Sequence, residues 1–112
     1  MKKIFISQPM RFRTKEEIQQ LREHATEWAA HELCDSVEVV NPPYCPGELR
    51  ELGKAIYSME EADFVIFTPG YSKYRGCRVE QMVAVNYNKK CLYMKEGTYG
   101  ASAYESGPGG RG

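Results

Sequence analysis

Apolar residues along this chain alternate between short β-branched or aromatic runs and stretches in which they recur at helical spacing. The short runs are typical of buried strands, and they lie at residues 3–7, 37–40, 64–68 and 91–94. Between them, apolar side chains recur every three or four positions, first from Thr14 to Leu33, then at residues 49–62, and finally at residues 79–87. The pattern therefore predicts the order βαβαβαβ.

Strands that alternate with helices indicate a parallel sheet with right-handed crossover connections. The simplest strand order is 2-1-3-4, which predicts a three-layer α/β fold with helices on both faces of the sheet. Glu38 is the one charge in the second strand and suggests a position near the sheet's edge. In this order the winding direction reverses between the first and third strands, and that reversal opens a ligand-binding crevice at their carboxyl ends.

The size and composition of the chain fit one domain. Its 112 residues, 42% of them apolar, suffice for one core in residues 1–95, and the glycine-rich residues 96–112 are expected to form a flexible tail. Fifteen basic residues balance fifteen acidic ones, so no overall positive field favours nucleic acid or an anionic membrane as partner.

The apolar run at the start of the chain and the spacing of the cysteines indicate the cellular compartment of the protein. Ser7, Gln8 and Pro9 end that run too early for a signal peptide or a membrane span, so we expect a cytoplasmic protein. The four cysteines show no C-x-x-C spacing, which favours free thiols in a reducing compartment. We expect Cys77 to be a small buried residue and Trp28 to lie in the core, whereas His24 and His31 should be solvated.

Three loops are expected to converge on the crevice, and the first follows the first strand. It offers the hydroxyl of Ser7, the amide of Gln8 and the guanidinium of Arg11, next to the free N–H groups at the start of a helix. These groups suit a phosphate or a carboxylate. The alternative is that Arg11 and Arg13 are solvated loop charges. The proline-rich loop after the second strand adds Tyr44 from the flank.

The loop after the third strand carries the strongest candidate for chemistry. Gly70 and Gly76 bracket a polar segment that contains Tyr71, Tyr74 and Arg75, and whose backbone can approach a ligand closely. Glu80 follows, in what the pattern indicates is the first turn of the third helix. There the positive end of the helix dipole favours the carboxylate and its use as a nucleophile. The alternative is an ordinary glutamate that stabilises a helix start.

Three motifs together resemble the nucleoside 2-deoxyribosyltransferase superfamily over residues 3–94, namely Ile4-Phe5-Ile6-Ser7-Gln8-Pro9-Met10-Arg11, Glu61-Ala62-Asp63 and Arg75-Gly76-Cys77-Arg78-Val79-Glu80. The chain is most similar to the small phage and bacterial branch that also includes deoxynucleoside 5'-monophosphate N-glycosidases. The resemblance implies a flavodoxin-like fold, no cofactor, and Glu80 as the nucleophile. It also implies a phosphate or sugar pocket, matched here by Ser7, Gln8, Met10, Arg11, Tyr74, Arg75 and Gly76.

The implied activity is cleavage or transfer of the N-glycosidic bond of a 2'-deoxynucleoside or its 5'-monophosphate. The departing base needs a proton or a hydrogen bond, and Tyr44, Tyr71 or Tyr74 can supply it. Members of the superfamily often place a helper aspartate on the helix before the third strand, where this chain reads Gly53-Lys54-Ala55-Ile56. Asp63 should lie at the opposite end of the sheet. Lys54 or a neighbouring subunit takes that role, or catalysis is absent.

Two further alternatives are a nucleotide-binding module without catalysis and a flavodoxin-type electron carrier. The absent helper aspartate favours the first. The lack of a Ser/Thr-rich phosphate loop after the first strand weakens the second. A four-stranded sheet leaves edges and helix faces partly uncovered, so we expect a homodimer or a larger homo-oligomer.

Overall fold

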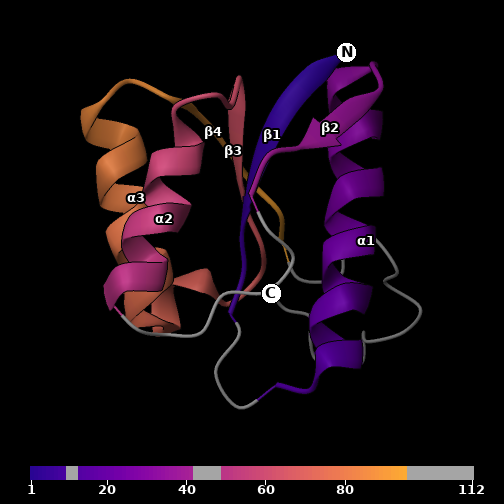
Figure 1. The fold of residues 1–112 in the computed structure, drawn as a ribbon. Helices are drawn as coiled ribbons and strands as arrows, with labels where there is room; N and C mark the ends of the chain where they lie inside the picture. The colour runs from indigo at the N-terminus through magenta and orange to yellow at the C-terminus, as the bar shows by residue number, and fades with distance from the viewer. Residues whose placement is uncertain (10–12, 42–48, 96–112) are drawn as a thin grey trace.

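The structure, a computed structural model, describes residues 1–9, 13–41 and 49–95 (Figure 1). Four parallel strands form one sheet in the order β2-β1-β3-β4, with Glu38 on an edge strand. The strands are β1 (Lys2–Ser7), β2 (Val37–Val39), β3 (Phe64–Phe67) and β4 (Lys90–Tyr93). The predicted fold class and strand order are confirmed, and the arrangement is a flavodoxin-like, three-layer α/β fold. The predicted tail at residues 96–112 lies outside the described residues.

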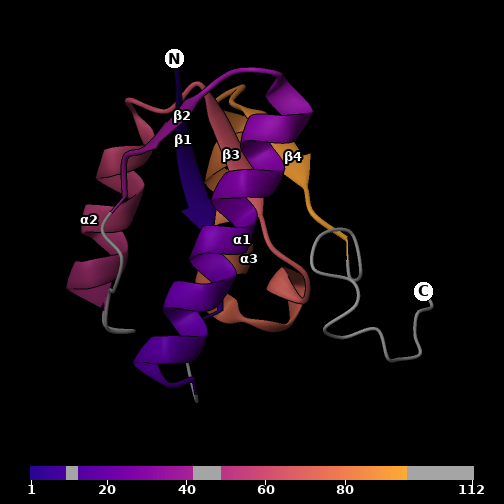
Figure 2. The ribbon, with the colours of Figure 1, turned by 90° about the vertical axis from the view of Figure 1, so that its right-hand side faces the viewer.

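Helices cover both faces of the sheet. Helix α1 (Lys15–Leu33) packs on one face, and α2 (Leu49–Met59) and α3 (Arg75–Asn86) lie on the other (Figures 1 and 2). The α1 side buries Ile4, Ile6, Ile66 and, as predicted, Trp28. The other side is packed around Phe5, Val65 and Phe67. Because side chains alternate along a strand, Ser7 faces the same layer as Phe5, toward α3.

Helix α1 begins as the sequence predicted. Thr14 accepts a hydrogen bond from the Glu17 backbone N–H at 3.0 Å, and the Glu17 side chain accepts one from the Thr14 N–H at 3.0 Å. This reciprocal capping box satisfies two of the unpaired N–H groups at the helix start. No helix within the described part of the chain is both long and apolar enough to cross a membrane.

Helix α3 begins about one turn earlier than the apolar pattern indicated. Tyr74 is its N-cap and makes no side-chain capping bond, and a 3-10 turn, η1 (Tyr71–Lys73), precedes it. The predicted loop from Gly70 to Gly76 is therefore wrong, because its last residues are already helical. The sequence misled here because Arg75 and Gly76 carry no helix-start signal. Gly70 itself adopts φ of 82°, which glycine tolerates without strain.

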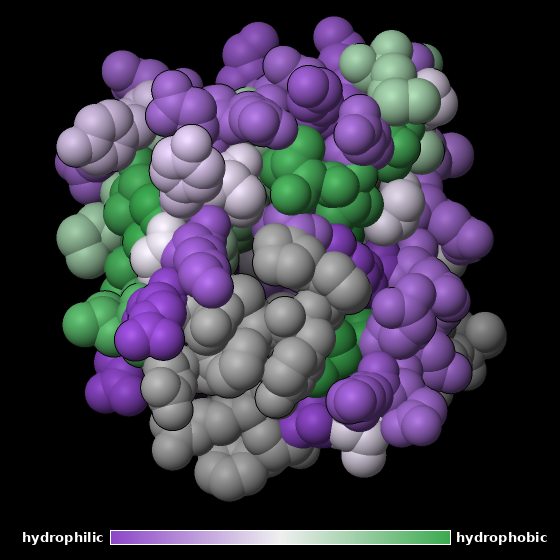
Figure 3. Space-filling view, in the orientation of Figure 1, coloured by the Kyte–Doolittle hydropathy of each residue, from purple (hydrophilic) through white to green (hydrophobic). Residues whose placement is uncertain are grey.

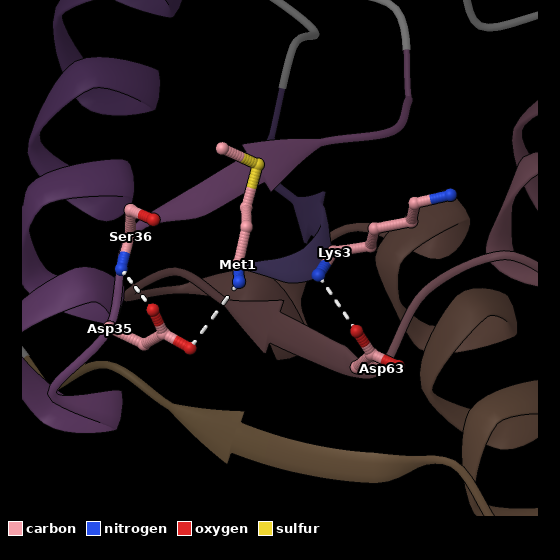
Figure 4. Close-up of polar contacts among 5 residues, drawn as sticks. All are labelled: Met1, Lys3, Asp35, Ser36 and Asp63. Carbon is pink, nitrogen blue, oxygen red and sulfur yellow. Dashed lines mark hydrogen bonds and ion pairs between the residues drawn. The ribbon is translucent and has the colours of Figure 1, made fainter.

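Two aspartates organise the amino end of the sheet, as Figure 4 shows. The Asp63 carboxylate accepts a hydrogen bond from the Lys3 N–H at 2.8 Å, and the Asp63 N–H donates to the Lys3 carbonyl at 2.7 Å. Asp35 accepts from the Ser36 N–H at 2.8 Å and lies 3.6 Å from the Met1 amino group. Asp63 thus pins the start of β3 to β1, and its predicted place away from the crevice is confirmed.

Asn41 extends the pairing of β1 and β2 beyond the last residue of β2. Its side chain accepts from the Ile6 N–H at 2.9 Å and donates to the Ile6 carbonyl at 2.8 Å, as a strand residue's backbone would. The buried Arg22 side chain donates to the Asn41 carbonyl. An amide side chain therefore satisfies the backbone of β1 just before the strand reaches Ser7.

Asn41→Ala should destabilise the fold by about 2 kcal/mol, because it leaves the buried N–H and carbonyl of Ile6 without these partners. Urea unfolding followed by circular dichroism measures the change. Asn86→Ala removes a matched side chain whose one hydrogen bond, to the Met82 carbonyl, is exposed, so it should cost less than about 0.5 kcal/mol. Equal losses in the two variants would contradict the role given to Asn41.

Candidate active site

A short hydrogen bond joins Glu80 to Ser7 at the carboxyl end of the sheet. The Ser7 hydroxyl donates to Glu80 Oε1 at 2.6 Å, which connects the last residue of β1 to α3 across 73 positions of sequence. Ser7 is 1% exposed, and Glu80 is partly buried. Since β1 and β3 are the neighbouring strands between which the winding direction reverses, the pair lies where parallel α/β proteins bind ligands.

Burial raises the pKa of Glu80 to about 7, and the hydrogen bond from Ser7 opposes that rise. The expectation that a first-turn position favours the ionised form is wrong, since Glu80 lies in the second turn of α3, away from the free N–H groups. At neutral pH the carboxyl group therefore exists in comparable amounts with and without its proton. Such a group can act as a nucleophile or as an acid and base near pH 7.

Thr68 holds the end of β1 in place beside Glu80. Its backbone N–H donates to the Ser7 carbonyl at 3.1 Å, and its side-chain hydroxyl donates to the same oxygen at 3.2 Å. Thr68 is fully buried. Sequence reasoning treated it as the end of a strand and missed this contact, which depends on the register of β3 against β1.

Cys77 completes a small polar cluster under α3. It lies one turn before Glu80 on α3 and is 4% exposed. Burial raises the pKa of the Cys77 thiol to about 11, and the charge of Glu80 adds to that rise. The raised pKa favours the neutral thiol at physiological pH, and the burial of Cys77 confirms the small buried cysteine predicted from sequence.

Gln8 lies on the opposite side of β1 from Ser7. Its side-chain amide donates to the Ile18 carbonyl in α1 at 3.1 Å, and the residue is 5% exposed. Among the residues that the structure describes, none forms a hydrogen bond with its Oε1 atom. The structure therefore does not bring Gln8 together with Glu80, because consecutive residues of an extended chain face opposite layers.

Tyr71 belongs to an aromatic cluster at the carboxyl ends of β3 and β4. Its ring centroid lies 5.0 Å from that of Phe67 and 5.6 Å from that of Tyr93, and Phe67 stacks on Tyr93 at 5.2 Å. Gln81 donates to the Tyr93 hydroxyl at 3.1 Å. Sequence reasoning missed Tyr93, although its position two residues after Cys91 indicated that both side chains lie on the same face of β4.

Some of the remaining predicted site residues lie at the start of α3, and the others lie outside the described residues. Tyr74 is partly buried at the N-cap of α3, and Arg75 and Gly76 are exposed in its first turn. Arg78 ties this turn to η1 by donating to the Ser72 carbonyl at 3.1 Å. Met10, Arg11 and Tyr44 lie outside the described residues. Lys54, the candidate substitute for the helper aspartate, is exposed on α2.

Comparison with protein-family models, with curated proteins and with solved structures gives no match. Within residues 1–9, 13–41 and 49–95, no group of three or more histidine, cysteine, aspartate or glutamate side chains is arranged to hold a metal ion. The cysteines in these ranges, Cys34, Cys77 and Cys91, are free thiols.

Proposed function

We propose that this protein cleaves or transfers the N-glycosidic bond of 2'-deoxynucleosides or their 5'-monophosphates, with Glu80 as the nucleophile. The observation that carries the proposal is the 2.6 Å hydrogen bond by which Ser7 orients Glu80 at the carboxyl end of β1. The resemblance of three ordered motifs to nucleoside 2-deoxyribosyltransferases supports the same reaction.

The proposed reaction has two displacements. The ionised Glu80 attacks C1' of the deoxyribosyl group, the bond from C1' to the base nitrogen breaks, and its electron pair leaves with the base, which takes up a proton. Water or a second base then attacks C1' of the glycosyl ester, its proton passes to the group that protonated the departing base, and Glu80 is released as the carboxylate. Two inversions at C1' give overall retention of configuration.

The cluster contributes orientation and a matched pKa. Ser7 restrains one carboxylate oxygen of Glu80, so the other is available to attack. A carboxylate whose pKa is about 7 is a stronger base, and hence a better nucleophile, than an exposed one. Arg11 and Met10 are proposed to complete the phosphate end of the substrate pocket, with Tyr44, Tyr71, Tyr74, Arg75 and Gly76 around the sugar and the base.

The second candidate is a nucleotide-binding module without catalysis. The observation that favours it is Lys54 at the place of the helper aspartate, because Asp63 is held at the opposite end of the sheet by Lys3. A binding module would keep the pocket and its arginine without needing an ionised Glu80.

Incubation with the four 2'-deoxynucleosides, their 5'-monophosphates and the matching ribonucleotides tests the proposal. Chromatography should show free base from at least one deoxy substrate, with the 5'-monophosphate preferred because Arg11 supplies a cation. Adding a second base distinguishes transfer from hydrolysis. An inert protein that nevertheless binds a nucleotide in calorimetry would establish the binding module instead.

A homo-oligomer is part of the proposal. Four large apolar side chains on α2 and α3, those of Leu49, Tyr57, Met82 and Val85, are each more than half exposed. Figure 3 shows apolar residues in green on this side of the molecule, at the left of the view. Burial of such a face against a second copy would supply the association energy, and we expect the assembled protein in the cytoplasm.

A further inference from the structure

We propose that the carboxyl end of β4, the turn η1 and the first turns of α3 form a binding surface for single-stranded DNA beside Glu80. The surface combines three exposed cations with two tyrosine rings, those of Lys73, Arg75, Arg78, Tyr71 and Tyr93. Binding to this surface stands independently of any reaction. Only the presentation of a bound nucleotide to Glu80 rests on the proposed function.

Charge is distributed unevenly over the molecule, although the chain is neutral overall. On one face of the sheet, α1 carries five exposed glutamates against one exposed lysine, Lys15. Residues 64–95, which contain β3, η1, α3 and β4, have a single acid, the partly buried Glu80. The same residues have six cations, namely Lys73, Arg75, Arg78, Lys89, Lys90 and Lys95. Neutrality of the whole chain therefore does not exclude a polyanion as partner, because this side has a local positive field.

Side-chain contacts join the three elements into one continuous surface. Arg78 in α3 donates to the Ser72 carbonyl in η1 at 3.1 Å. The Tyr71 ring of η1 lies 5.6 Å from the ring of Tyr93 at the end of β4. The guanidinium of Arg78 is thereby held in place beside Lys73, and its other N–H groups can bind a phosphate.

Tyr93 offers a rigid aromatic face next to these cations. The fully buried Phe67 stacks on the Tyr93 ring, with their centroids 5.2 Å apart and their planes at 17°. Gln81 holds the Tyr93 hydroxyl at 3.1 Å. Tyr93 nevertheless stays 40% exposed, so the face of the ring away from Phe67 is open to a base. Because its neighbours already fix the ring, stacking a base on it costs little conformational entropy.

The combination of cations and aromatic faces favours a single strand over other anions. Unpaired bases stack on aromatic side chains while cations bind the phosphates between them. In a duplex the bases stack on one another, and an acidic peptide would use the cations but not the face of the ring. Glu80 lies two residues after Arg78 on α3, so a bound strand would present a 2'-deoxynucleotide, the substrate class of the proposed function.

Fluorescence anisotropy of a labelled dT oligomer of about 12 nucleotides tests the cations, with the annealed duplex and polyglutamate as competitors. The Glu80→Gln background is used because it cannot turn over the strand. The logarithm of Kd should rise with the logarithm of the salt concentration with a slope of about 2, since each of three phosphate contacts contributes about 0.7. Lys73→Gln and Arg75→Gln should each weaken binding and lower that slope by about 0.7. Lys2→Gln, at the opposite end of the sheet, should change neither.

A pair of variants at Tyr93 tests the aromatic face. Tyr93→Leu keeps an apolar side chain but removes the ring, so it should weaken binding about tenfold, whereas Tyr93→Phe keeps the ring and should stay within about twofold. Absence of binding, unchanged affinity in Tyr93→Leu, or equal competition by polyglutamate or the duplex would overturn the inference. Binding that depends on the cations and the ring, in a wild-type protein that releases no base, would refute only the proposed reaction. Failure of the proposed function is thereby separated from failure of the surface.

Discussion

Glu80→Gln is expected to lower the rate of base release by at least about 10³-fold, because the amide cannot form the glycosyl ester that the two displacements require. Glutamine keeps the size of the side chain and can still accept the hydrogen bond from Ser7. The loss should therefore appear in kcat, with little change in substrate binding measured by calorimetry. Chromatography of the released base measures the rate.

Two further measurements make this result specific to Glu80. Acid quenching of the wild type during turnover should leave a deoxyribosyl adduct that peptide mass spectrometry assigns to Glu80. Glu61→Gln alters an exposed carboxylate in the turn that follows α2 and should retain full activity. Release of base by Glu80→Gln at a rate within tenfold of wild type would exclude Glu80 as the nucleophile.

The second large effect is a pH dependence of stability that needs no substrate. The pKa of Glu80 rises from 4.5 to about 7 on folding, so between these values the folded protein keeps a proton that the unfolded chain has lost. Unfolding then releases a proton, and the free energy of unfolding falls as pH rises through this window. This rise of the pKa corresponds to about 3 kcal/mol of stability, which is present at low pH and is fully lost above pH 7.

Glu80→Gln should remove this component, because glutamine resembles the protonated side chain at every pH. The variant should match wild type near pH 4 and exceed it by about 3 kcal/mol near pH 8, as measured by urea unfolding at both pH values. Glu61→Gln should follow wild type throughout. A constant difference between wild type and Glu80→Gln across this range would show that the carboxyl group is not held in a low-dielectric site.

The two results together indicate that the burial of Glu80 lowers stability while it favours the proposed function. A glutamate whose ionised form is disfavoured by burial costs folding energy at neutral pH, and the same burial makes its carboxylate more basic. Ser7 limits that cost with one charge-assisted hydrogen bond. The site therefore sacrifices stability at the position where the proposed chemistry needs a nucleophile.

Much of the architecture was predictable because it depends on local periodicity. Alternating strand and helix patterns lead to parallel crossovers, and the strand order 2-1-3-4 was predicted as the simplest arrangement compatible with them. The Thr14 capping box, the edge position of Glu38 and the core position of Trp28 are likewise local signals. The start of α3 was not predictable, since neither Tyr74 nor its neighbours carry a capping side chain.

The sequence by itself determined which strands meet at the crevice and that Glu80 would stand near their carboxyl ends. Only the tertiary structure decided that Ser7 faces Glu80 while Gln8 faces α1, that Cys77 adjoins the pair, and that the pKa of Glu80 is raised rather than lowered. The physical reason is that strand order follows from connections along the chain. Protonation and hydrogen bonding depend on burial and on how α3 packs against β1. That packing brings together Ser7 and Glu80, which lie 73 positions apart in the sequence.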